Sequence, residues 1–310
     1  MLTAEVLAKT NKLDRTEWLK LRRQGLGGSD AAAAAGLNKW KSPLALWMEK
    51  TGQVEPPKPG EAAYWGTMLE DVVAREFSRQ TGLKVKRKNA LLQHYRYHHM
   101  LANVDRLVAG QEAGLECKTT GQFNKDDWEE KRIPYEYILQ CQHYLAVTGF
   151  KTWYIAVLIG GNKFIWREIK RDQQIIDCLI QIETCFWHHV VSGHPPVPDG
   201  TESSSEVLKL LYPQSVPESK VQLPELALEL VETYDRAREA EEKAKEEKEQ
   251  AANRLKILLG KSETGLIGDR QVNWKTVESA RLDTKALKEE HPDIYTQYAK
   301  ISSTRRFTVK

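Results

Sequence analysis

The chain has 310 residues, of which 41% are hydrophobic and 29% charged, and its formal net charge is +3 at pH 7. This length and composition predict a packed globular protein with one large domain, or a domain with an appendage. The small net charge excludes a strongly basic tail, so any contact with nucleic acid must come from local clusters. The sequence has no run of 18 apolar residues and no apolar signal core near its N-terminus. We therefore expect a soluble cytoplasmic protein without a membrane partner.

The first predicted elements are two helices joined by a glycine-rich turn. Asp14 is placed to cap a helix that runs to about Gln24, the segment Gly25–Asp30 interrupts it, and Ser29 is expected to cap a second, alanine-rich helix. A glycine-rich turn that leads into a helix presents free backbone N–H groups, which suit a phosphate. The alternative is a plain connection between two helices, and the turn taken alone favours it.

Two further helices are predicted at about 42–50 and 62–80, the first with Pro43 at its first position. In the second helix, Glu70 shares an apolar face with Val73 and Phe77, because residues three and four apart are neighbours on a helix. A carboxylate on an apolar face needs a partner, which makes Glu70 a candidate functional residue. The alternative is a surface side chain that reaches solvent.

The most informative stretch follows, where strands are predicted at about 83–92, 100–108 and 115–119. Side chains two apart share a strand face, so Glu116 and Lys118 project together, and a hairpin in register brings Asp105 onto that face. Two carboxylates beside one ammonium are costly unless a divalent cation lies between them. The arrangement suits phosphodiester hydrolysis, with the acids holding the metal and Lys118 steadying a water or the developing charge. The alternative is a solvated strand face.

The next elements complete an α/β pattern. A helix is predicted from Pro134 to about Val147, with Gln140 and Tyr144 one turn apart on one face. A strand pair at 151–158 and 163–169 and a helix at 172–191 follow. This order of elements predicts an α/β fold with a mixed central sheet flanked by helices.

A domain boundary is expected in the proline-rich segment 194–200, which divides the chain into 1–200 and 201–310. Beyond it, a long charged helix is predicted at about 224–259, with a narrow apolar seam and a length of about 50 Å. The tail, with segments near 271–276, 282–290 and 305–309, is expected to form a small α+β unit. We interpret this extension as a scaffold or an oligomer contact.

Several of these motifs occur in one fixed order, and the combination is far more specific than any single member. With them the sequence resembles the YqaJ-type viral recombinase family, the phage lambda-exonuclease-like branch of the PD-(D/E)xK nuclease superfamily. The resemblance implies a restriction-endonuclease-like core with the C-terminal extension appended. The matching segments are Gly27–Asp30, Lys41–Trp47, Gly66–Glu70, Asn103–Asp105, Glu116–Lys118, and Gln140 with Tyr144.

The resemblance implies roles for the acidic residues and the lysine. Asp105 and Glu116 would be Mg²⁺ ligands, and the backbone carbonyl of Cys117 would complete one site. Glu70 would assist through a second Mg²⁺ or its waters, and Lys118 would activate or position the attacking water. Two Mg²⁺ ions per active site are thus expected, with Mn²⁺ able to replace them.

The resemblance also implies a site for DNA ends. Ser29 and either Arg22 or Arg23 would receive the terminal 5′ phosphate with the help of Gln140, and Tyr144 joins them as a DNA-binding residue. Relatives that carry an iron–sulfur cluster need a cysteine near the N-terminus and a late cysteine trio. The sequence has neither, and its cysteines lack paired spacing, so we expect no cluster and reduced, buried thiols. The four are Cys117, Cys141, Cys178 and Cys185.

The function implied is a Mg²⁺-dependent exonuclease that digests linear double-stranded DNA from 5′ ends. It would leave 3′ single strands for an annealing protein during phage-type recombination, in a bacterial host that carries the phage or prophage. Related enzymes form trimeric rings, so a trimer is expected. The alternatives are a structure- or sequence-specific endonuclease on the same fold, and a non-catalytic DNA-binding assembly factor that works through the long C-terminal helix.

Overall fold

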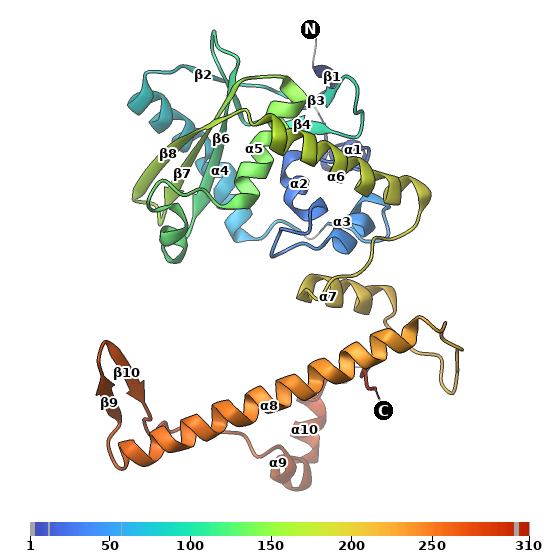
Figure 1. Cartoon of the computed structure of the whole chain (residues 1–310), viewed down its shortest axis with the longest axis vertical. Coiled ribbons are helices and arrows are strands. Elements are labelled where there is room, and N and C mark those ends of the chain that lie inside the picture. Colours follow the sequence, from blue (N-terminus) through green and yellow to red (C-terminus); the bar gives the residue numbers. More distant parts are fainter. Residues whose placement is uncertain (1–3, 12, 57, 301–303, 310) are drawn as a thin grey trace. The chain divides into compact units, whose positions relative to one another are not determined.

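The computed structural model describes residues 4–11, 13–56, 58–300 and 304–309 (Figure 1). The chain separates into two compact units, Met1–Leu211 and Tyr212–Lys310. The first unit continues past residue 200 because helix α7 (Glu202–Leu211) packs on it. There, the backbone N–H of Ser42 donates to Ser203 Oγ at 3.0 Å, and Val207 is buried in the same apolar cluster as Leu44. Among the described residues, no helix is both long and apolar enough to cross a membrane.

The first unit is built on two sheets within the described residues. The larger sheet has the strand order β2-β5-β6-β7-β8, in which β6 and β7 are parallel and the other neighbours are antiparallel, so the predicted mixed sheet is confirmed. The smaller sheet is antiparallel, with the order β1-β3-β4. The strands are β1 (Ala4–Lys9), β2 (Val85–Arg87), β3 (Ala90–His94), β4 (Leu101–Asn103), β5 (Arg106–Val108), β6 (Ala113–Thr120), β7 (Thr152–Ile159) and β8 (Lys163–Lys170).

Helices begin largely where the sequence predicts them. Asp14 caps α1 with a reciprocal bond from Glu17, Ser42 caps α3 ahead of a proline, and Asp172 caps α6. Each cap satisfies backbone N–H groups that have no partner inside the helix. The remaining elements of this unit are α1 (Arg15–Arg22), α2 (Gly28–Ala34), α3 (Pro43–Lys50), α4 (Glu61–Thr81), the 3₁₀ helix η1 (Gln122–Trp128), α5 (Tyr135–Thr148) and α6 (Gln173–Ser192).

The larger sheet is covered on both faces, by α4 on one and by α5 on the other (Figure 1). Alternate residues of β7 show the division, because successive side chains on a strand point to opposite faces. Ile155 is buried in the cluster that contains Tyr144 of α5, whereas Ala156 is buried with Phe77 of α4. On β6, Leu115 packs towards α4. The alternation therefore turns Glu116 and Lys118 towards α5.

Two of the predicted strands are broken. The strand expected at 100–108 is split into β4 and β5, which lie in different sheets, and the strand expected at 83–92 is split likewise into β2 and β3. At the split, Asp105 Oδ2 accepts the backbone N–H of Cys117 at 2.8 Å, so a side chain takes the place of a ladder bond. The prediction that Ser29 caps α2 was also wrong. The helix starts at Gly28, and Asp30 accepts the Gly27 N–H instead.

The cysteines differ from the expectation of four buried thiols. Cys141 is buried and Cys117 partly buried, but Cys178 and Cys185 are exposed. Both exposed thiols belong to α6, whose buried face carries Ile176, Leu179 and Phe186 at helical spacing. The two cysteines fall outside that stripe.

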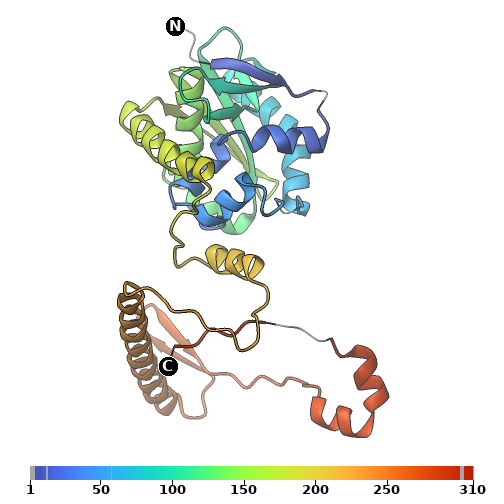
Figure 2. The ribbon, with the colours of Figure 1, turned by 90° about the vertical axis from the view of Figure 1, so that its right-hand side faces the viewer.

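The second unit contains the predicted long helix, α8 (Ala227–Leu259), which ends at Gly260 (Figures 1 and 2). No residue on α8 is buried within the described part of the chain. A hairpin follows, in which Gly265 approaches Leu259 of the helix. The tail is a small α+β unit, as predicted, made of β9 (Thr264–Ile267), β10 (Arg270–Asn273), α9 (Thr284–Glu290) and α10 (Pro292–Tyr298).

Candidate active site

The predicted acidic pair and lysine meet at one point of the larger sheet. Arg106 pairs with Leu115 across β5 and β6, which places Asp105 beside Glu116. Lys118 follows two residues later on the same face, and its Nζ lies 2.6 Å from Glu116 Oε1. The hairpin expected from the sequence is therefore confirmed in its register, and it brings these three side chains together.

Helix α5 completes this group from above the sheet. Gln140 Nε2 donates to Glu116 Oε1 at 2.7 Å and to Tyr144 Oη at 2.9 Å, and its Oε1 accepts from Lys118 Nζ at 3.0 Å. Tyr144 Oη in turn donates to the backbone carbonyl of Asn103 at 3.3 Å. The one-turn spacing of Gln140 and Tyr144 thus gives a continuous polar network from β6 to the end of β4.

The two carboxylates oppose each other electrostatically. Burial, and then the negative charge of Glu116, raise the pKa of Asp105 well above its ordinary value, while the Cys117 N–H lowers it in part. Glu116 is 3% exposed, and its buried Oε2 has no hydrogen-bond partner among the residues that the structure describes. An unsatisfied carboxylate oxygen beside a second, half-buried carboxyl group is a costly arrangement that a cation relieves.

Lys118 is held as a cation. Burial lowers the pKa of Lys118, but the charge of Glu116 and the hydrogen bond to it outweigh burial, and the net pKa lies above the ordinary lysine value. The ring of Tyr137 also faces the ammonium, with Nζ 4.9 Å from the ring centroid. A protonated lysine orients a water or stabilises negative charge; it does not remove a proton.

Glu70 approaches the same region from α4, on the opposite side of the sheet. Its carboxylate is ion-paired with Arg106 Nη1, and Arg106 Nη2 contacts Asp71 Oδ1 at 2.5 Å. Arg106 is 4% exposed and also donates to the backbone carbonyl of Asp105 at 2.7 Å. One buried guanidinium therefore ties Glu70 to the residue that carries the first carboxylate.

The donors suit an oxygen-seeking divalent cation, although no ready-made cluster of three acidic, histidine or cysteine side chains occurs within the described residues. Glu70 is engaged by Arg106, so the side chains that a cation would find are Asp105 and Glu116. The unpartnered Glu116 Oε2 is the observation that favours a cation here. Mg²⁺ commonly uses only one or two protein carboxylates, with water and substrate phosphate supplying the other oxygens.

A second polar group lies across the cleft, where α1 meets α2. Arg22 Nη2 lies 3.2 Å from Ser29 Oγ and 3.2 Å from Asp30 Oδ2. Lys50 Nζ contacts the same Asp30 oxygen at 2.8 Å. Burial raises the pKa of Asp30, but Lys50 and Arg22 outweigh it and hold the pKa below the ordinary value. Asp30 is thus a buried anion that fixes Arg22 beside Ser29.

The two candidate arginines are separated by the structure. Arg22 is beside Ser29, whereas Arg23 Nη2 pairs with Glu55 at 2.7 Å. Arg22 also lines the cleft that contains the acidic pair, and Arg23 does not. Of the two candidate arginines, Arg22 therefore lies beside Ser29 and Arg23 does not.

The cleft encloses about 500 Å³ and joins most of the predicted residues. A neighbouring hollow of about 330 Å³ adds Glu70 and Cys117 to Asp105, Glu116 and Lys118. The side chains that line the main cleft include Arg22, Ser29, Asp105, Glu116, Lys118, Gln140 and Tyr144.

Three participants were not identified from the sequence. Arg106 follows Asp105 directly, and a basic residue inside an apolar strand was the signal that could have revealed it. Asp30 and Lys50 are buried, at 3% and 8% exposure, and pair across 20 residues of sequence. No pattern of neighbouring residues predicts a contact between side chains that far apart in the sequence.

Gly28 is required by the close packing of α2 on α5. A Cβ at this position would lie 2.5 Å from the Tyr144 ring, whereas one at Gly27 would meet nothing nearer than 3.6 Å. We expect Gly28→Ala to lower the free energy of unfolding by about 1–3 kcal/mol, because an extra methyl group overfills the contact. Chemical denaturation measures the change, and Gly27→Ala is the matched control. Equal stability of the two variants would contradict this packing role.

Comparison with known families identifies the N-terminal part of the chain. Residues 17–151 match the model of the YqaJ-like viral recombinase domain. The chain is also 45% identical over 311 residues to the protein YqaJ of Bacillus subtilis (strain 168), and this match covers 99% of the chain and 98% of its relative. The likeness to that relative therefore extends through the C-terminal unit.

The fold of the chain is similar to that of a solved nuclease. The crystal structure of an alkaline exonuclease from Laribacter hongkongensis matches with a TM-score of 0.50 and 19% sequence identity, over 58% of this chain and 94% of the other. At that identity the match shows the fold alone, and it confirms a mixed α/β nuclease fold with a central sheet flanked by helices over the matched part of the chain.

Proposed function

This chain belongs to the YqaJ-like viral recombinase domain family, and we propose that it is a Mg²⁺-dependent exonuclease that digests linear double-stranded DNA from 5′ ends. The observation that supports this proposal is the convergence of Asp105, Glu116 and Lys118 in one cleft. The same cleft presents Arg22 and Ser29 to a second phosphate. Two sites for phosphate, one hydrolytic and one for recognition, are what an end-directed nuclease needs.

The reaction is hydrolysis of one phosphodiester bond. Water adds to phosphorus, the P–O3′ bond breaks, O3′ takes the proton on the released nucleotide, and the new DNA end keeps its 5′ phosphate. The protonated Lys118 is placed to orient the water and to stabilise negative charge at phosphorus. Gln140 holds Lys118 and Glu116 in their relative positions through its amide oxygen and nitrogen.

A divalent cation bound by Asp105 and Glu116 would supply positive charge to the phosphoryl oxygens. The carbonyl of Cys117 is a further oxygen of the same strand, in the hollow that Glu70 also lines. Glu70 can contribute only after it leaves Arg106, and this exchange would bring a third carboxylate to the site. We propose two Mg²⁺ ions per site, replaceable by Mn²⁺.

Recognition of an end follows from the charge of its phosphate. A terminal phosphate carries about −1.5 to −2 charge at pH 7, more than the single negative charge of an internal phosphodiester. Arg22, aligned by the buried Asp30, offers a guanidinium, and Ser29 offers a hydroxyl. Charge-assisted hydrogen bonds of this kind favour the doubly charged group. These contacts support recognition of a terminal phosphate, and from the family resemblance we propose that this phosphate is at the 5′ end.

The family resemblance adds two proposals. The 3′ strand that survives digestion would be passed to a single-strand annealing protein, as in recombination by strand annealing. Three copies of the chain would close into a ring around the DNA, which would keep the enzyme on its substrate.

The proposed function is tested on linear duplex labelled at one 3′ end, with and without a 5′ phosphate, in Mg²⁺. We expect the phosphorylated strand to be digested at least about tenfold faster, the loss typical of removing a charge-assisted contact. We also expect single strands with 3′ ends to remain after digestion. A chelator that removes divalent cations should stop the reaction. Digestion that continues after excess unlabelled DNA is added tests the ring.

A covalently closed circular duplex is the control for this assay. An exonuclease leaves it intact, whereas nicking of the circle would identify an endonuclease instead. If neither Mg²⁺ nor Mn²⁺ produces digestion of any end, the proposal is rejected in favour of the non-catalytic DNA-binding alternative.

A further inference from the structure

A second cavity adjoins the cleft at Arg22. It measures about 220 Å³ and is lined by α1, by Lys41 just before α3, by the end of α3, and by Pro56 and Pro59. Trp18 and Arg22 line this cavity and also line the cleft. The cavity is therefore a continuation of the cleft past the residues assigned to the terminal phosphate.

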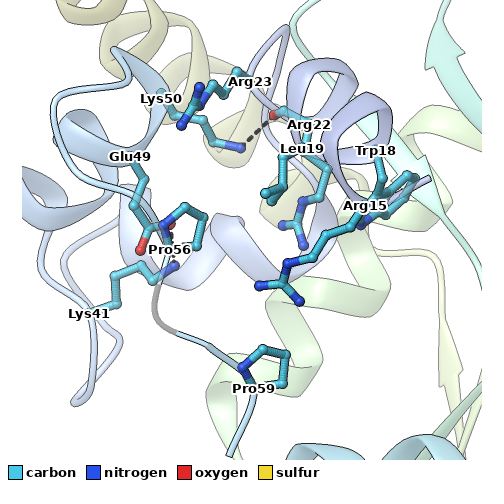
Figure 3. Close-up of a pocket in the computed structure, with 10 residues that line it drawn as sticks. All are labelled: Arg15, Trp18, Leu19, Arg22, Arg23, Lys41, Glu49, Lys50, Pro56 and Pro59. Carbon is cyan, nitrogen blue, oxygen red and sulfur yellow. Dashed lines mark hydrogen bonds and ion pairs between the residues drawn. The ribbon is translucent and has the colours of Figure 1, made fainter. Parts of the chain in front are cut away.

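The cavity is rich in cationic side chains (Figure 3). Arg15 and Arg22 reach from α1 towards the same space, and the paired side chains of Lys41 and Glu49 face them from the other side. The cationic residues that line it are Arg15, Arg22, Arg23, Lys41 and Lys50.

The acidic groups near the cavity do not balance these cations. Lys41 pairs with Glu49 and Arg23 with Glu55, each at 2.7 Å. Arg22 and Lys50 share the single carboxylate of Asp30. Arg15 has no ion pair within the described part of the chain, so five cations face three acids and two positive charges remain. An anionic group placed here is attracted to this excess of positive charge.

Arg22 has N–H donors for ligands in both the cleft and the cavity. Within the described residues, all of its side-chain hydrogen bonds leave from Nη2, towards Ser29 and Asp30. A guanidinium has five N–H donors. The groups on Nε and Nη1 are therefore available to a ligand beside the one that contacts Ser29.

Four apolar side chains complete the wall of the cavity between these charged groups. Trp18 and Leu19 come from α1, and Pro56 and Pro59 lie across from them. An aromatic face combined with arginines is the pairing that single-stranded nucleic acid uses, because a base stacks on the ring while the phosphate meets the cation. The volume is below the roughly 300–1,000 Å³ of typical small-molecule pockets, so it suits one nucleotide unit and no longer strand.

We propose that this cavity holds one unpaired nucleotide on the 5′ side of the phosphate at Arg22 and Ser29. This inference rests on the proposed function and specifies its substrate: duplex ends with a one-nucleotide 5′ overhang bind in addition to blunt ends. Arg15 contacts the phosphate of the overhanging nucleotide and Trp18 contacts its base. The hydrolytic step is unchanged, and the first product from such an end is a dinucleotide.

The experiment measures binding without cleavage, by fluorescence anisotropy in Ca²⁺, of duplexes that are blunt or carry a one-nucleotide 5′ overhang, both 5′-phosphorylated. We expect the wild-type chain to bind the overhang about tenfold more tightly, the size of one charge-assisted contact. Arg15→Glu should abolish this preference and leave binding of the blunt end within about twofold. Lys20→Glu, an exposed change on the same helix, is the matched control.

Two outcomes would overturn the inference. One is equal affinity of the wild-type chain for the two ends, and the other is an Arg15→Glu variant that weakens both ends equally. Because neither measurement needs cleavage, the result stands apart from the digestion assay that tests the proposed function. In Mg²⁺, a mononucleotide as the first product of the overhang end would also contradict it.

Discussion

Lys118→Ala is expected to lower the rate of DNA digestion by at least a factor of about 10²–10³, the loss typical of removing one group that stabilises transition-state charge. Lys118 contacts Glu116 and Gln140 and is held protonated, so the variant lacks the ammonium that contacts the acidic pair. DNA binding should be retained, because Arg22 and Ser29 are untouched. Single-turnover digestion of 5′-phosphorylated duplex measures the rate, and anisotropy measures binding.

Lys151→Ala is the control for this variant. Lys151 is 83% exposed, and its contact with Glu112 at 3.7 Å is a surface pair that contributes little. The control should digest DNA at the wild-type rate. Full activity of Lys118→Ala would reject the role assigned to the lysine, and loss of its folded circular dichroism spectrum would call for Lys118→Met in its place.

The second large effect concerns a buried pair behind the cleft. His143 and Glu183 are both fully buried and lie 2.9 Å apart, and His143 Nε2 faces the backbone carbonyl of Leu101 at 2.8 Å. A carbonyl oxygen only accepts, so Nε2 carries a proton. The pair joins α5, which holds Gln140 and Tyr144, to α6 and to β4. We expect His143→Leu to destabilise the first unit by about 3–5 kcal/mol, because a buried carboxylate loses its partner.

The pH dependence of this pair has a definite sign. Burial lowers the pKa of His143, but the charge of Glu183 and the hydrogen bond to it raise the pKa above its ordinary value of 6.5. A raised folded-state pKa means that the pair stabilises fully below the unfolded pKa and less as the pH rises through the folded value. The stability difference between wild type and variant should therefore shrink above a pH of about 6.5.

Chemical denaturation at several pH values checks both statements. His143→Leu combined with Glu183→Leu should lose less stability than His143→Leu alone, because no charge is then left buried. His188→Leu, an exposed change on α6, is the control and should stay within about 0.5 kcal/mol of wild type. A single variant as stable as the control would contradict the role of the pair.

Short-range signals in the sequence predicted much of the fold. Asp14 caps a helix as predicted, and helices begin beside Ser42 and Asp172 where they were predicted to start, because helix starts depend on a few neighbouring residues. The spacing of Glu116 and Lys118 predicted a shared strand face, because the side to which a strand residue points depends only on its position along the strand. The hairpin register then placed Asp105 beside them.

Long-range contacts account for what the sequence did not predict. The strand expected at 100–108 changes sheets at Asp105, where that side chain accepts the Cys117 N–H and the sequence has no breaker residue. The choice between Arg22 and Arg23 depended on Asp30, whose burial with Lys50 is a tertiary event. The engagement of Glu70 by Arg106 likewise joins a helix to a strand 36 residues away.

The position of Asp105 between two sheets has a practical consequence for trapping a substrate complex. Its Oδ2 accepts the hydrogen bond from the Cys117 N–H that a main-chain carbonyl would otherwise accept. The side chain therefore has a structural role as well as being a candidate metal ligand. Asp105→Ala would remove both roles at once. An inactive Asp105→Ala variant would therefore not show whether the lost hydrogen bond or the lost carboxylate caused the inactivity. Asp105→Asn keeps a carbonyl oxygen that can accept the Cys117 N–H and removes only the negative charge. It is therefore the cleaner substitution for capturing intact DNA on this enzyme.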